Sequence, residues 1–273
     1  MPPPLLTRRV YAGPTMDEAP ARFNLRLAEG AGVVASARMP AGLTATSGPA
    51  FRDHRGLVLE RMRVHLVFWG TAWLAAESPS ADQVTAAVTR LLASGYMAGL
   101  AQYRGIRAAA LQGTTSATSS DPPNPFTSRH VTDLLSQLIS DHAVPEPDEV
   151  QQLLYCVIMP SGVACQDSSV IGEHSYFWYW GFDLPFDPDV GKAYYAWVTN
   201  DGSLDGVTTI LSHELVESAS DPEGSAVLGD PGVCSAAGWC EIGDVCQGIT
   251  GSVAEVAVQA YWSQEVGRCV IPS

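Results

Sequence analysis

A predicted helix over residues 205–222 carries the side chains best suited to chemistry. Its aliphatic residues recur at helical spacing and predict one buried face, and Pro222 ends the helix. His213 and Glu217 are four residues apart. Side chains at this spacing share one helix face, with Cβ atoms about 6 Å apart, and could grip one metal ion. Glu214 lies beside them, which completes the pattern HExxE.

HExxE differs from the HExxH motif of metallohydrolases by a carboxylate in place of the second histidine. In HExxH the two outer residues bind zinc, and the Glu beside the first His acts as general base. We therefore predict a metal-dependent hydrolase, with His213 and Glu217 as ligands and Glu214 as catalytic base. The expected metal is zinc, although a carboxylate ligand also suits calcium or manganese, and the expected substrate is a peptide or protein.

A third ligand is expected downstream of the helix. Glu241, in the segment Glu-Ile-Gly-Asp, is favoured, and Asp221 at the end of the helix is the alternative. Asp244 could orient a ligand, bind a second, calcium-like ion, or simply occupy a turn.

His174 precedes an expected edge strand, where it could bind the metal or donate a hydrogen bond to a substrate oxyanion, so it is a candidate catalytic residue. The four remaining histidines, at positions 54, 65, 130 and 142, have no acidic or histidine partner at an informative spacing. We interpret those four as structural.

Strand and helix patterns alternate along the chain, which predicts a single mixed-sheet α/β domain of zincin-like character, with an active-site helix and a loop-rich, acidic C-terminal lobe. Residues 1–60 are expected to be an extended or loosely packed N-terminal segment, and residues 61–273 the metallohydrolase-like domain. A polar loop is expected at 112–127. Strands are expected at 63–70, 103–110, 153–159, 175–180 and 194–198, and helices after Ser80, at 128–141 and from about Asp205.

Composition sets limits on the class of protein. The 273 residues are 46% hydrophobic and 16% charged, which favours a packed core over disorder, and no apolar run is long enough to cross a bilayer. The net charge is −14. Residues 146–273 hold most of the acids and only Lys192 and Arg268 as bases, so nucleic acid is an unfavourable partner and cations are favourable ones.

All six cysteines lie between residues 156 and 269, and no two of them form a CxxC pair. The even count favours disulfide bonds in an oxidising compartment over a four-cysteine zinc site. Cys240 and Cys246 flank Glu241 and could hold its loop in place. The first 20 residues do not have the pattern of an ordinary signal peptide, so secretion or a cell-envelope location rests on the cysteines.

The chain resembles the exordium-like, or phosphate-induced, protein family and its bacterial relatives. Bacterial sequences of this kind pair a His-Glu helix like HELVESASDP with a later segment like EIGDVC, whereas the plant members do not keep the His-Glu pair. The resemblance implies an exported protein. It is carried by Trp69-Gly70, Cys165, Gly172 to His174, Tyr195 to Val198, Asp205 to Val207, Gly243-Asp244 and Gly267 to Pro272.

Two other functions fit the same residues. An exported binding or wall-associated protein could hold a structural ion in this site. A glycan hydrolase could instead pair Glu214 or Glu217 with Glu241 or Asp244, without a metal between them.

Overall fold

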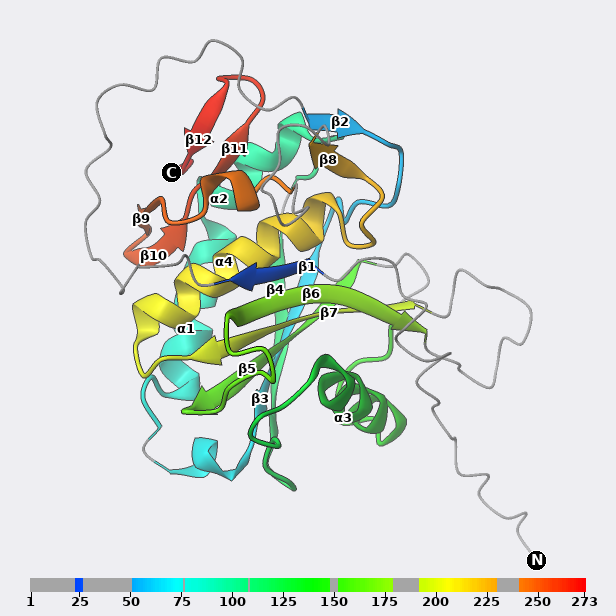
Figure 1. The fold of residues 1–273 in the computed structure, drawn as a ribbon, viewed down its shortest axis with the longest axis vertical. Helices are drawn as coiled ribbons and strands as arrows, with labels where there is room; N and C mark the ends of the chain where they lie inside the picture. The colour runs from blue at the N-terminus through cyan, green and yellow to red at the C-terminus, as the bar shows by residue number, and fades with distance from the viewer. Residues whose placement is uncertain are drawn as a thin grey trace, which may run out of the picture.

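The computed structural model describes residues 23–26, 51–75, 77–107, 109–147, 152–178, 192–229 and 241–273. Within these ranges the molecule is built on a six-stranded sheet of order β1-β6-β7-β5-β3-β4 (Figure 1). Strands β4, β3, β5 and β7 are parallel neighbours, while β6 is antiparallel to β7 and β1 is antiparallel to β6. The strands are β1 (Phe23–Arg26), β3 (Arg63–Trp69), β4 (Ala110–Ala117), β5 (Leu153–Ser161), β6 (Val170–Trp178) and β7 (Lys192–Asn200).

Helices cover both faces of this sheet. Helices α1, α2 and α4 lie on one face and α3 on the other (Figure 1). They are α1 (Ala81–Ala93), α2 (Gly95–Ala98), α3 (Ser128–Ser140) and α4 (Leu204–Ser220). The 3₁₀ turns are η2 (Thr71–Leu74), η3 (Gly99–Gln102) and η4 (Asp244–Cys246).

The alternation of side chains along the central strands produces two hydrophobic cores. On β3, Val64 and Leu66 belong to the core under α1 and α4, whereas Val67 belongs to the core under α3. Both faces of β3 and β5 are therefore buried, as is typical of parallel strands covered by helices on either side.

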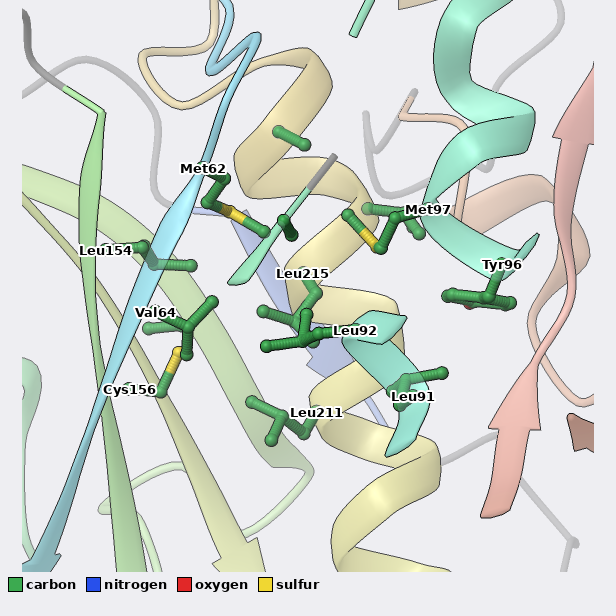
Figure 2. Close-up of a cluster of buried hydrophobic side chains, with 14 of the residues drawn as sticks. Met62, Val64, Leu91, Leu92, Tyr96, Met97, Leu154, Cys156, Leu211 and Leu215 are labelled. Atoms are coloured by element: carbon green, nitrogen blue, oxygen red, sulfur yellow. The ribbon is translucent and has the colours of Figure 1, made fainter. Parts of the chain in front are cut away.

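Helix α4 is buried almost all round because β6, β7, α1 and β10 all pack against it. Figure 2 shows Leu211 and Leu215 of α4 in one cluster with Val64 of β3 and with Leu91 and Leu92 of α1. Burial on several sides makes the position of α4 rigid, so side chains along it are held in a fixed place relative to β6.

The C-terminal part adds short strand pairs above α4. Strand β2 (Phe51–Asp53) pairs with β8 (Val227–Gly229), β9 (Thr250–Val253) with β10 (Val256–Gln259), and β11 (Tyr261–Ser263) with β12 (Arg268–Val270). Strand β10 packs against α4. A disulfide between Cys246 and Cys269 joins η4 to β12, which confirms the prediction of disulfide bonding.

The mixed α/β class is confirmed, but the strand expected at 103–110 is wrong. η3 ends at Gln102 and residues 103–105 form a turn, whereas β4 begins only at Ala110 and runs to Ala117, into the polar loop expected at 112–127. β4 is an edge strand with alternating exposed residues, so its Thr, Ser and Gly content resembles that of a loop. Within the stretch expected to be loosely packed, Val58 and Leu59 are buried in the core.

No single helix in the described ranges is long and apolar enough to span a membrane. The bent pair Ala81–Ala93 and Gly95–Gln102 reaches that length and composition only when its two members are taken together.

Candidate metal centre

Helix α4 places His213, Glu214 and Glu217 in the interior of the molecule. The helix begins after Ser203, whose hydroxyl accepts a hydrogen bond from the Gly206 N–H, and the three side chains are at most 2% exposed. His213 Nε2 lies 3.0 Å from Glu217 Oε2. The shared helix face predicted from their spacing is therefore confirmed.

The segment 241–246 meets this face of α4. The Asp244 N–H donates to Glu217 Oε1 at 3.0 Å, and Asp244 Oδ1 lies 3.9 Å from His213 Nε2. Gly243 permits this approach, because a Cβ at that position would lie 2.6 Å from Glu217 Oε1 and 2.9 Å from His213 Nδ1. The Gly in Glu-Ile-Gly-Asp is thus required by the packing of the loop on the helix.

His174 reaches the cluster from the sheet. Its Nδ1 lies 3.1 Å from Glu214 Oε2, and its Nε2 lies 3.5 Å from Glu241 Oε1. The residue lies within β6, which begins at Val170, rather than just before a strand as the sequence suggested. Gly172, two residues before His174, leaves room for the Glu214 carboxylate, since a Cβ at position 172 would lie 2.4 Å from Glu214 Oε1.

Two sets of side chains in the described ranges could each hold a metal ion. One is His213, Glu217 and Asp244, and the other is His174, Glu217 and Glu241, with the ligand atoms of each set within 4.8 Å of one another. Nitrogen and oxygen donors of this kind suit zinc or manganese. The predicted ligands therefore meet, but Glu241 groups with His174 whereas Asp244 groups with His213.

The buried atoms of this cluster fit a cation. His213 Nε2 and both carboxylate oxygens of Glu241 are buried without a well-formed hydrogen bond to the described part of the chain. No Lys or Arg in that part forms an ion pair with Glu214, Glu217 or Glu241. The only cationic partner of these carboxylates in that part is the His174 imidazole, which ion-pairs with Glu214 and Glu241, and a divalent ion would offset the remaining cost of burying them.

Burial also dominates the titration of the cluster. It raises the pKa of Glu214, Glu217 and Asp244 to about 7 and that of Glu241 well above its ordinary range. Burial lowers the pKa of His213. For His174 burial also acts to lower the pKa, but Glu241 and Glu214 outweigh it, and the pKa lies well above its ordinary value. Without metal, protons must therefore compensate these carboxylates.

Asp221 has a different place. It is the C-terminal cap residue of α4, and its Oδ1 accepts hydrogen bonds from the Ser225 N–H at 2.6 Å and the Ala226 N–H at 2.7 Å. Burial raises its pKa to about 6. The residue belongs to neither ligand set, and its hydrogen bonds shape the turn that leads from α4 into β8.

Gln259 is the residue that sequence reasoning missed. From β10, its Nε2 donates to His213 Nδ1 at 2.7 Å and to the Gly243 carbonyl at 3.0 Å. It thus orients the imidazole with Nε2 toward Glu217 and ties α4 to the 241–246 segment. A lone Gln in a short strand gives no signal of this role, because the contact depends on a chain reversal 46 residues after His213.

The Cys246–Cys269 disulfide anchors the segment that carries Asp244. Cys234 and Cys240 lie outside the described residues. In the described part of the chain, Cys156 is a buried free thiol and Cys165 a partly exposed one.

Comparison of the chain with protein-family models, with curated proteins and with solved structures gave no match.

Proposed function

We propose that this protein is a metal-dependent hydrolase of peptide bonds, with zinc as the resident ion. The observation that carries the proposal is the set of buried His213 and Glu217 with partly exposed Asp244, and Glu214 next to it on the same helix. Asp244 replaces Glu241 as the proposed third ligand of the His213 set, because Asp244 approaches His213 directly.

Glu214 is proposed as the general base. Its pKa of about 7 suits a group that takes up and returns a proton near neutral pH, and it belongs to neither ligand set. His174 Nδ1 lies within hydrogen-bond distance of Glu214 Oε2 and would hold that carboxylate in position. A bound divalent ion would supply Lewis-acid chemistry by polarising a carbonyl and acidifying water.

The position of β6 near the edge of the sheet supports a zincin-like arrangement, in which an extended peptide substrate binds along such a strand. β6 runs antiparallel to β7 at the end of the parallel strands, and its outer edge pairs with β1, with Phe23 opposite His174 and Leu25 opposite Gly172. Figure 1 shows β1 running beside β6 and α4. This edge accepts an extended chain by backbone pairing, so a substrate bound there would have to displace β1.

The role of β1 can be tested in the full chain. In an antiparallel ladder successive residues point their N–H groups to opposite sides, so replacing both Asn24 and Leu25 by Pro removes at least one hydrogen bond to β6. We expect the double Pro variant to cleave peptides faster than the parent, and the double Ala variant to match the parent. Equal rates in all three proteins would show that β1 does not limit access.

The proposed function is tested by incubating the zinc-loaded protein with a mixed peptide library and identifying products by mass spectrometry. We expect cleavage by the parent and by Glu60→Gln, an exposed control, and none by Glu214→Gln, which should keep its zinc. Full cleavage by Glu214→Gln, or no cleavage by the parent, would refute the assignment.

A second candidate is an exported, exordium-like binding protein with a structural ion. The burial of the cluster favours it, since His174, Glu214 and Glu241 are at most 1% exposed. A structural ion has all its coordination positions filled by protein, whereas a catalytic ion keeps an exchangeable one. Binding of a small hydroxamate to the zinc-loaded protein would favour the hydrolase, and its failure to bind would favour the structural ion.

A further inference from the structure

We propose that the centre binds two divalent ions, one in each ligand set, with Glu217 shared between them. The inference rests on the proposed metal centre and extends it from one ion to two. It assigns a ligand role to Glu241, which the single-ion site of His213, Glu217 and Asp244 leaves unused, and to His174, which that site uses only to hold Glu214.

The side chains form two groups, each of which could hold one metal ion. The ligand atoms in each set lie within 4.8 Å of one another, a spread that oxygen and nitrogen donors about 2.0–2.2 Å from a central ion can reach with small adjustments. The sets have only Glu217 in common. The two imidazoles come from different elements, His213 from α4 and His174 from β6, whereas Glu241 and Asp244 both come from the segment 241–246.

Glu217 is oriented for a shared role. Its Oε1 accepts the hydrogen bond from the Asp244 N–H, so the carboxylate plane is fixed. Its Oε2 lies 3.0 Å from His213 Nε2 and 3.8 Å from His174 Nδ1. One carboxylate oxygen thus faces both imidazoles.

The charge of the cluster also favours a second ion. Four carboxyl groups, those of Glu214, Glu217, Glu241 and Asp244, meet here, and Lys and Arg make no ion pair with them in the ranges that the structure describes. One divalent ion compensates two carboxylates, and two ions compensate all four. Both oxygens of Glu241 are buried and lack a well-formed hydrogen bond, which independently marks the second set as a place for a ligand.

The test is the stoichiometry of metal binding to the metal-free, full-length protein. Zinc and, separately, manganese are titrated and followed by calorimetry and native mass spectrometry. We expect two ions per chain for the parent and for the exposed control Glu60→Gln. We expect one ion for Glu241→Gln, which alters the second set, and one for Asp244→Asn, which alters the first.

A spectroscopic readout separates two neighbouring ions from two distant ones. Two manganese ions that share Glu217 should give an exchange-coupled paramagnetic resonance spectrum in the parent, and Glu241→Gln should give the spectrum of an isolated ion. Circular dichroism verifies that each variant is folded, and if a variant unfolds, the parent's stoichiometry and spectrum decide.

The outcomes distinguish this proposal from the proposed function. One ion per chain with both metals, or two ions without coupling, would overturn the two-ion centre. If one zinc ion binds and peptides are still cleaved, the hydrolase stands without the second ion. If no ion binds, both proposals fail.

Discussion

Replacing Glu214 by Gln is expected to stabilise the metal-free protein at pH 8 while changing its stability little at pH 4.5 or below. Burial raises the pKa of Glu214 from an ordinary 4.5 to about 7 in the folded protein. The folded state therefore holds this proton more tightly than the unfolded state. The stability associated with the neutral carboxyl is fully present below about pH 4.5 and is lost as the pH rises through 7.

The magnitude follows from that difference in pKa. At about 1.4 kcal/mol per pH unit, the step from 4.5 to about 7 corresponds to about 3 kcal/mol for this one carboxyl group. Gln cannot ionise and has nearly the same shape as Glu. The free energy of unfolding of the variant should therefore not fall through ionisation at position 214. A substitution that abolishes catalysis should therefore stabilise the metal-free protein at alkaline pH, as strained functional sites often allow.

The assay is urea denaturation in the presence of a chelator, followed by circular dichroism between pH 4.5 and pH 8. The free energy of unfolding of the parent and of the exposed control Glu60→Gln should fall across this range, and that of Glu214→Gln should fall less, by about 3 kcal/mol at pH 8. The same pH dependence in the parent and in Glu214→Gln would refute the reasoning. Saturating zinc should remove most of the difference, because the ion stabilises the ionised carboxylates of the parent.

Other substitutions probe the ligands and their support. His213→Ala should abolish binding of the ion held with Asp244, and Glu217→Gln should weaken metal binding, both measured by elemental analysis after dialysis. Gln259→Leu should weaken zinc binding about 10- to 100-fold, because it removes the amide group that contacts His213 Nδ1; an unchanged affinity would show that Gln259 does not position His213. Reducing the Cys246–Cys269 disulfide should release metal before the far-UV dichroism changes, and simultaneous loss would mean that the bridge supports the whole domain.

Local patterns predicted the parts of the structure that depend on periodicity. The i, i+4 spacing of His213 and Glu217 fixes their shared face once a helix forms, and the long aliphatic runs of β3 and β5 mark buried parallel strands. β4 was missed because an edge strand with one exposed face can be built from Thr, Ser and Gly. The pairing of β1 with β6 joins segments about 150 residues apart, and no local pattern encodes it.

The site was predictable as a set of residue types but not as a set of partners. The acidic charge and the neighbouring cysteines mark Glu241 and Asp244 as candidate ligands. Which of them approaches His213 depends on the path of a short loop whose Gly243 packs on the helix. Gln259 could not be inferred, because its role comes from a strand that returns across α4. Tertiary contact, rather than spacing, assigns these roles.

The position of the metal is tested most directly by anomalous diffraction from crystals of the zinc-loaded protein, recorded on both sides of the zinc absorption edge. We expect a strong peak in contact with His213, Glu217 and Asp244, with Glu214 beside it. No peak within bonding distance of His213 and Glu217, or a peak only at the protein surface, would contradict it.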